Sequence, residues 1–290
     1  MSKTPRKTVL ISGTSQGGIG DALAKEFHRQ GLRVIATARN LAKVQHLKDL
    51  GLDVLPLDVV DHASIQDAVK SVEKFTGGKL DILINNSGNG YNQSMLDSDV
   101  DIAKKMFDVN VFAIIEVTKA FAPQLIASKG KVVNIGSIAG IIPLPWGGYY
   151  DASKAAVNHL TRALRIELAP LGVDAINITT GVVKTKFFDN LNAPKLPANS
   201  VYAPAKDLIE PVMAGAGLEE AGMEADVFAA AVVKNVLKSN STKDQWVGGN
   251  TFIVWFASTF GWATIWDVIV PRLFKIGEVT KRIQAAGKSK

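Results

Sequence analysis

A tyrosine and a lysine four positions apart, Tyr150 and Lys154, are the residues whose types and spacing most clearly suggest chemistry. On a helix, positions i and i+4 share a face, so the phenol and the ammonium would lie side by side. A phenol ordinarily titrates near pKa ~10, and a neighbouring cation favours the phenolate. We therefore expect Tyr150 to exchange a proton near neutral pH, with Ser137, at the end of an apolar run, donating a hydrogen bond to a substrate carbonyl. A surface tyrosine and lysine at this spacing also arise by chance, so the pair needs support from the rest of the chain.

The hydrophobic pattern predicts the scaffold that would bring these residues together. Short apolar runs typical of strands alternate with longer stretches of helical periodicity. The expected strands are Thr8–Ser12, Arg33–Ala38, Asp53–Leu57, Leu80–Asn85, Lys131–Gly136 and Val173–Ile178. The expected helices are Ile19–Gln30, Leu41–Leu50, Ala63–Phe75, Val100–Ala127, Tyr150–Ala169 and Ala225–Leu237. This alternation predicts an α/β fold, a doubly wound parallel sheet (Rossmann fold) whose ligands bind beyond the carboxyl ends of the strands.

The length and composition indicate one large domain with an extension. The chain has 290 residues, of which 47% are hydrophobic and 21% charged, enough for a sizeable core and too few charges for disorder. We divide it into a catalytic domain, residues 1–245, and an apolar C-terminal extension, residues 246–290. The net charge of +6 is spread along the chain except at both termini, so we expect no nucleic-acid partner. There is no cysteine, which excludes disulfides and thiolate zinc sites, and we expect no metal site. The short, polar N-terminus shows no secretory signal.

A glycine-rich turn between the first strand and the first helix predicts a dinucleotide site. It reads Ser12-Gly13-Thr14-Ser15-Gln16-Gly17-Gly18-Ile19-Gly20. Glycines let the backbone approach a pyrophosphate closely, and the helix N-terminus supplies N–H donors. We expect Gly13, Ser15, Gly18, Ile19 and Gly20 to contact the cofactor. A merely flexible loop is the alternative, but it does not explain this placement.

The end of the second strand favours NADPH/NADP+ as the cofactor. An acidic residue there would bind a ribose 2′-hydroxyl and favour NAD. The strand ends instead on Ala38-Arg39-Asn40, and an arginine suits a 2′-phosphate. The alternative is that Arg39 only solvates the start of a helix.

Residues 7–190 resemble the short-chain dehydrogenase/reductase family. Besides the glycine turn and Y-x-x-x-K, the shared motifs are Leu57-Asp58-Val59, Asn85-Asn86-Ser87-Gly88, Asp108-Val109-Asn110-Val111 and Thr180-Gly181-Val182-Val183-Lys184-Thr185. The resemblance implies a catalytic tetrad, which here is Asn110, Ser137, Tyr150 and Lys154. It also implies that Asp58 meets the adenine and that the remaining cofactor contacts are Val59, Asn86, Gly88, Tyr150, Lys154, Val183 and Thr185.

Three departures from the family pattern leave the catalytic groups intact. The glycine turn has one residue more than usual, Ser87 replaces a usual alanine, and Thr180 replaces a usual proline. The long turn, the segment Gly78-Lys79-Leu80-Asp81 and the apolar tail are similar to one branch, the fungal NADPH-dependent 1-acyldihydroxyacetone-phosphate reductases. These are lipid-biosynthetic enzymes associated with endoplasmic reticulum and lipid droplets. Related fungal sequences act as ketoreductases in secondary metabolism.

The C-terminal extension contains sixteen consecutive uncharged residues, 251–266. Its aromatic residues are Phe252, Trp255, Phe256, Phe260, Trp262 and Trp266. A membrane span needs about 20 apolar residues, so a true span is disfavoured. An interfacial helix with the basic flank of Lys275, Lys281 and Arg282 would contact a membrane or lipid droplet peripherally. A lid over the substrate pocket or a homo-oligomer contact fits the sequence equally well.

We therefore expect an NADPH-dependent carbonyl reductase that reduces a ketone to a secondary alcohol. The resemblance assigns Tyr150 as proton donor and Ser137 as holder of the oxygen. It assigns Lys154 to lowering the Tyr150 pKa and binding the ribose, and Asn110 to relaying protons through water. The substrate is either 1-acyldihydroxyacetone phosphate or a polyketide, steroid or terpenoid ketone, and an inactive NADP-binding scaffold is the remote alternative. A phosphorylated substrate would need cations such as Lys184, Lys186 or Lys206. The residues of the expected substrate loop, 186–222, do not identify the substrate. We expect an intracellular protein, cytoplasmic or peripheral on endoplasmic reticulum or lipid droplets.

Overall fold

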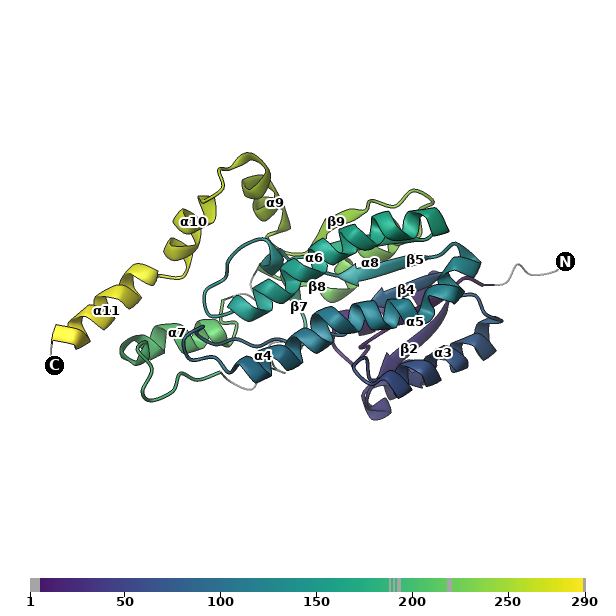
Figure 1. Ribbon diagram of the computed structural model, residues 1–290, viewed down its shortest axis with the longest axis horizontal. Coiled ribbons are helices and arrows are strands. Elements are labelled where there is room, and N and C mark those ends of the chain that lie inside the picture. Colours follow the sequence, from purple (N-terminus) through teal and green to yellow (C-terminus); the bar gives the residue numbers. More distant parts are fainter. Residues whose placement is uncertain (1–5, 188, 190, 192–193, 218–220, 289–290) are drawn as a thin grey trace.

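The computed structural model describes residues 6–187, 189, 191, 194–217 and 221–288 (Figure 1). Part of the expected substrate loop, residues 188, 190, 192–193 and 218–220, lies outside the described residues.

Within the described residues, a seven-stranded parallel sheet forms the centre of the fold, with the order β3-β2-β1-β4-β5-β6-β9. The strands are β1 (Thr8–Ile11), β2 (Arg33–Ala38), β3 (Asp53–Pro56), β4 (Ile82–Asn85), β5 (Lys131–Ile135), β6 (Asp174–Thr180) and β9 (Asp244–Val247). The strand order reverses at β1, since Ile11 pairs with Ala36 of β2 on one side and Ile84 of β4 on the other. The predicted doubly wound fold is confirmed, and its ligand site is expected at this reversal.

Helices cover both faces of the sheet, which explains why the strands read as continuous apolar runs. In β1, Val9 and Ile11 face one core cluster and Leu10 the other. The first cluster lies under α1 (Ile19–Arg29) and α8 (Ala225–Val236), and the second lies under α3 (His62–Thr76) and α5 (Ala113–Ser128). Figure 1 looks onto the face covered by α3, α5 and α6 (Gly148–Leu168). The other helices are α2 (Gln45–Asp49), α4 (Val100–Phe107), α7 (Lys206–Met213), α9 (Thr251–Phe260), α10 (Ile265–Leu273) and α11 (Ile276–Lys288).

The helix expected at 100–127 is interrupted by a π-helical turn, η2 (Asp108–Phe112), between α4 and α5. Such turns are rare and often mark functional sites, and this one carries Asn110. Among the described residues, the run Val100–Ser128 is long and apolar enough to cross a membrane by length and composition. Val117 and Phe121 of this run are buried in the core against the sheet, so here it serves as a core helix.

Several elements beyond residue 180 differ from the sequence-based expectation. Strand β9, which was not expected, completes the sheet by pairing with β6 and crosses the division placed at 245/246. The substrate loop contains helix α7, and a small two-stranded sheet pairs β7 (Val183–Lys184) with β8 (Met223–Glu224).

The C-terminal extension forms three helices, α9, α10 and α11, and Gly261 adopts an extended conformation that ends α9 within the uncharged run. Figure 1 shows α9, α10 and α11 running one after another along the side of the domain that carries α6 and α7.

Candidate active site

The glycine turn lies at the strand reversal and is packed too tightly to accept larger residues at two positions. A Cβ atom on Gly20 would lie 2.4 Å from the carbonyl oxygen of Gly13 and 2.6 Å from Nδ2 of Asn86. Gly13 has φ +71°, which favours glycine, and a Cβ atom there would lie 2.9 Å from Oγ of Ser87. Asn86 in turn donates hydrogen bonds to the carbonyl oxygens of Ser12 and Gly13, at 2.9 and 2.8 Å. The turn is therefore held open and rigid in front of the N-terminus of α1.

The extra residue of the turn is accommodated by a carboxylate in the first turn of α1. Gly17 has φ +82°, and its N–H donates to Oδ2 of Asp21 at 2.9 Å. Burial alone would raise the pKa of Asp21, but hydrogen bonds from Gly17, His46 and Lys25 together hold that pKa below its ordinary value. The longer turn is thus fixed by an ionised side chain of its own helix.

Lys186 closes the turn from the opposite side. Its backbone N–H donates to the carbonyl oxygen of Gly17 at 3.2 Å, and its side-chain carbons lie over the Gly17 Cα. The sequence offers Lys186 as a partner for a substrate phosphate, whereas the structure places it in contact with the glycine turn. Only the fold, which brings residue 186 back to residue 17, could reveal this role.

Arg39 is exposed where β2 ends, beside the glycine turn. In the described part of the chain it has no ion-pair partner. The loop that follows is tied down, because Asn40 accepts from the N–H of Ala42 and the carbonyl oxygen of Lys43 accepts from Gln16. A guanidinium in this place is available to an anionic group of a ligand on the turn.

The remaining expected cofactor residues line the same edge of the sheet. Asp58 and Val59 follow β3, where Oδ1 of Asp58 accepts from the N–H of Val60 at 3.2 Å and Val59 is buried. Ser15, Gly18 and Ile19 form the end of the glycine turn, with the N–H of Gly18 donating to the carbonyl oxygen of Ser15 at 3.2 Å.

Val183 lies on β7, and Thr185 directly follows this strand. Oγ1 of Thr185 accepts a hydrogen bond from the N–H of Phe187 at 3.3 Å. The two glycines without room for a Cβ, the opening of α1 and Arg39 fit a dinucleotide.

Ser137 and Tyr150 come together at the carboxyl end of β5. Ser137 begins the turn η3 (Ile138–Gly140), where its Oγ accepts from the N–H of Ala139 at 3.0 Å. Tyr150 lies in the first turn of α6, and its ring packs against Phe187 with centroids 5.8 Å apart. A hydrogen bond with Ser137 lowers the pKa of Tyr150, but burial and the Asp151 carboxylate outweigh it.

Lys154 and Asn110 complete the group behind Tyr150. Lys154 is buried, and its Nζ donates to the carbonyl oxygen of Ile135 at 2.9 Å. Burial lowers the pKa of Lys154 to about 8. Asn110 is also buried and lies next to Gly88, where a Cβ atom would be 3.3 Å from Oδ1 of Asn110 and 3.9 Å from Nζ of Lys154.

The structure does not show the expected lowering of the Tyr150 pKa by Lys154. Burial raises the pKa of Tyr150 well above its ordinary value, and the Asp151 carboxylate adds to the rise. The ammonium of Lys154 is directed to a backbone carbonyl, 5.8 Å from the centre of the Tyr150 ring. Tyr150 therefore keeps its proton near neutral pH, which suits a proton donor.

Asn110 has structural partners that the sequence did not suggest. Its Nδ2 donates to the carbonyl oxygen of Asn89 at 2.9 Å and to Oγ of Ser153 at 3.1 Å, and its Oδ1 accepts from the N–H of Asn89 at 2.9 Å. Asn110 thus clamps the loop after β4 to α6, which holds Gly88 against Lys154.

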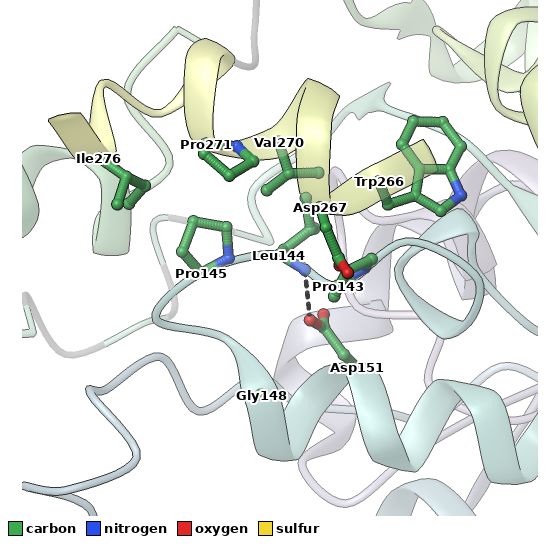
Figure 2. Close-up of a pocket in the computed structure, with 10 residues that line it drawn as sticks. All are labelled: Pro143, Leu144, Pro145, Gly148, Asp151, Trp266, Asp267, Val270, Pro271 and Ile276. Carbon is green, nitrogen blue, oxygen red and sulfur yellow. Dashed lines mark hydrogen bonds between the residues drawn. The ribbon is translucent and has the colours of Figure 1, made fainter. Parts of the chain in front are cut away.

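A cavity of about 390 Å³ lies beside the catalytic helix, between the loop after η3 and the C-terminal extension (Figure 2). Its residues are mostly apolar: Pro143, Leu144, Pro145, Gly148, Asp151, Trp266, Asp267, Val270, Pro271 and Ile276. Oδ2 of Asp151 accepts from the N–H of Leu144 at 2.7 Å, and burial raises the pKa of Asp151 to about 8. Nothing in the sequence indicated Asp151, because part of its environment comes from α10, more than a hundred positions away.

Two further observations bear on the departures from the family pattern. Thr180 ends β6 in register with Val247 of β9, and Ser87 receives its support from Ser12, whose Oγ accepts from the N–H of Ser87 at 3.0 Å. In the described residues, no group of three or more His, Cys, Asp or Glu side chains is arranged to hold a metal ion.

Comparisons with known proteins agree with this geometry. The sequence model of a family described as short chain dehydrogenase matches residues 7–196. The chain is 38% identical, over 94% of its length and 94% of the relative's, to short-chain dehydrogenase virD of Hypocrea virens. It is 42% identical, over 70% of each chain, to NADPH-dependent 1-acyldihydroxyacetone phosphate reductase of Schizosaccharomyces pombe. The crystal structure of a short-chain dehydrogenase from Streptomyces avermitilis has a TM-score of 0.77 at 25% identity, covering 97% of this chain and 99% of its own.

Proposed function

Because the chain belongs to the short-chain dehydrogenase family, we propose that it is an NADPH-dependent carbonyl reductase that converts a ketone to a secondary alcohol. The observation that carries the proposal is the grouping of Ser137, Tyr150 and Lys154 at the carboxyl end of β5. Strand β5 pairs with β4, and β4 pairs with β1, the strand that leads into the glycine turn. Proton donor, oxygen holder and cation are thus all present at the expected ligand site.

The chain's own residues supply the proton and the charge stabilisation. A nicotinamide cofactor bound at the glycine turn supplies the hydride. Tyr150 keeps its proton because its pKa is raised, and it gives that proton to the substrate oxygen as negative charge develops there. Ser137 donates a hydrogen bond to the same oxygen, which stabilises charge only as it forms. Lys154 holds positive charge behind the phenol, and Asn110 keeps the Gly88 loop against Lys154.

Arg39 supports the choice of NADPH. It is the cation at the end of β2, where an acidic residue would favour NADH. A guanidinium pairs with a phosphate through charge-assisted, often bidentate hydrogen bonds. The Schizosaccharomyces pombe relative is also named as an NADPH-dependent enzyme.

Two of the three lysines that could bind a substrate phosphate, Lys184 and Lys186, already have contacts within the protein. Lys184 is paired with Glu224 at 2.6 Å, and Lys186 lies against the glycine turn. A third candidate, Lys206 at the start of α7, is exposed. For this reason we favour an apolar ketone of the kind handled in fungal secondary metabolism over a phosphorylated one. The second candidate remains 1-acyldihydroxyacetone phosphate, on the strength of the 42% identical relative.

A matched pair of substrates separates these candidates. The full-length protein is given NADPH with 1-hexadecanoyl-dihydroxyacetone phosphate or its dephosphorylated form, and with cyclic and long-chain ketones, while NADPH oxidation is followed. We expect turnover of apolar ketones, with no gain in kcat/KM from the phosphate.

A preference of more than about tenfold for the phosphorylated form, lost in Lys206→Ala, would favour the second candidate. Tight NADPH binding without turnover of any ketone would instead indicate an inactive NADP-binding scaffold.

A further inference from the structure

Helix α9 and the turn after it expose a cluster of large apolar side chains, which we call the aromatic surface. Its members and their exposed fractions are Phe252 (70%), Ile253 (63%), Trp255 (38%), Phe256 (53%), Phe260 (67%) and Trp262 (60%). The rings already contact one another, with centroid distances of 6.2 Å for Phe252–Phe256, 5.1 Å for Phe256–Phe260 and 5.9 Å for Trp255–Phe260. Contiguous exposed apolar patches of this kind mark interaction sites.

The opposite side of α9 is anchored to the catalytic domain, so the aromatic surface has a fixed orientation. Thr251, Val254 and Ala257 are buried. Just before the helix, Gly249 exchanges hydrogen bonds with Val182, N–H to carbonyl oxygen in both directions, at 2.8 and 3.0 Å. A Cβ atom on Gly181 would lie 2.1 Å from the carbonyl oxygen of Gly249, so the two segments pack in direct contact. The root of the extension is thus fixed to the segment that leads into β7.

The rest of the extension folds back onto the substrate loop. Val279 of α11 is buried in a cluster with Ala205, Ile209 and Met213. Arg282 donates to both carboxylate oxygens of Asp207 at 2.7 Å. Helix α10 lines the cavity of Figure 2. The lid alternative therefore fits α10 and α11, whereas the described residues leave the aromatic surface of α9 uncovered.

We propose that the aromatic surface docks on an anionic lipid surface, with α9 lying in the plane of the interface. Ten helical residues extend about 15 Å, half the ~30 Å of a bilayer core, so α9 cannot span it. Tryptophan and phenylalanine suit the boundary between headgroups and acyl chains. This inference is independent of the reaction that the site performs.

Charge favours lipid over a second copy of the chain as the occupant. Residues 246–290 carry six Lys and Arg against two Asp and Glu, a net charge of +4 out of +6 for the whole chain. Lys275 and Lys281, which follow the aromatic surface in sequence, are exposed. A second copy would bring two such extensions together against their mutual repulsion, whereas an anionic surface attracts each of them.

The test is flotation of the full-length protein with vesicles of phosphatidylcholine alone and of phosphatidylcholine mixed with phosphatidylserine. We expect binding to the anionic vesicles at low salt, weakened by added salt. The variant Phe252→Ser/Phe256→Ser should bind at least about tenfold more weakly, because it removes two large apolar side chains that would leave water on insertion into lipid. Its matched control is Leu50→Ser/Ile166→Ser, which removes exposed apolar side chains elsewhere and should bind normally.

A second pair of variants tests the charge. Lys275→Glu/Lys281→Glu should weaken binding to anionic vesicles, while Lys48→Glu/Lys234→Glu changes the net charge equally on the catalytic domain and should weaken it less. NADPH binding by every variant checks folding. A blue shift of the unmodified protein's tryptophan emission on adding anionic vesicles provides a readout that needs no substitution.

Three results would overturn the proposal. The first is a full-length protein that stays free of anionic vesicles at low salt. The second is vesicle binding that the serine pair at 252 and 256 leaves unchanged. The third is a protein that binds no vesicles and forms a homodimer in solution, which the Phe252→Ser/Phe256→Ser variant does not form. This result would assign the aromatic surface to contact with a second copy of the chain.

Discussion

Lys154 places its Nζ 5.8 Å from the centre of the Tyr150 ring and donates a 2.9 Å hydrogen bond to the carbonyl oxygen of Ile135. The last residue of β5 therefore fixes the cation, so the charge is in place before any ligand binds. Preorganised charge of this kind lowers a barrier without reorganisation at the moment of reaction. The phenol itself stays protonated, because burial raises its pKa.

The alkaline limit of activity should follow Lys154. Its folded pKa, lowered by burial to about 8 from the usual 10.5, means that the free protein loses this ammonium as pH rises through 8. We expect kcat/KM for NADPH, which reports groups of the free enzyme, to fall about tenfold per pH unit above that point. The measurement is a pH profile from 6 to 10, with circular dichroism to exclude unfolding. A profile that stays flat to pH 10 would contradict this role.

Cofactor preference should depend on Arg39. Arg39→Ala removes the cation at the end of β2, and a charge-assisted hydrogen bond contributes roughly 1.5–3 kcal/mol. We expect KM for NADPH to rise about 10- to 100-fold while KM for NADH changes little. Arg29→Ala, which removes an exposed arginine of α1, is the matched control. A wild-type protein that prefers NADH would remove the basis of the prediction.

Asp151 should make stability depend on pH. Its folded pKa, raised by burial to about 8, exceeds the ordinary 3.8, so its contribution is fully present below pH 3.8 and is lost as pH rises to 8. The Asp151→Asn protein has no carboxyl group to ionise, so it does not lose this stability as pH rises. Its side-chain oxygen can still accept the hydrogen bond from the N–H of Leu144. The Tm of Asp151→Asn minus the Tm of wild type should increase from pH 5 to pH 9, by roughly 2–4 °C for each kcal/mol of stability that the wild type loses.

Asp67→Asn, at an exposed carboxylate, serves as the control for Asp151. A Tm difference between Asp151→Asn and wild type that is constant over this pH range would show that Asp151 is not buried as a neutral group.

The sheet and the grouping of Ser137, Tyr150 and Lys154 could be predicted because their signals are local. Strand runs and helical periodicity stand out in a parallel α/β fold, and Tyr150 and Lys154 lie on one helix. The π-helical turn that carries Asn110 could not be predicted, because the apolar periodicity of residues 100–127 is that of one continuous helix. Strand β9 was missed because its four residues precede a glycine pair and alternate only weakly.

The electrostatics could not be predicted, because they depend on contacts between distant segments. The raised pKa of Tyr150 results from burial, to which Phe187 contributes, and that residue lies in the substrate loop. The environment of Asp151 includes Trp266 and Val270 of α10. The break at Gly261 likewise separates a helix with an exposed aromatic face from one that lines a cavity, although the sequence shows one uncharged run.

The most direct test of the proposed reaction is Tyr150→Phe, which keeps the ring and its contact with Phe187 but removes the proton. The measurement is single-turnover oxidation of bound NADPH by an apolar ketone, with NADPH affinity determined in parallel. We predict a rate at least ~10²-fold below wild type with nearly unchanged NADPH affinity, within the range that general acid catalysis contributes. Tyr149→Phe, at the neighbouring position, should keep the wild-type rate. A Tyr150→Phe protein that retains more than half of the wild-type rate would contradict the assignment of Tyr150 as the proton donor.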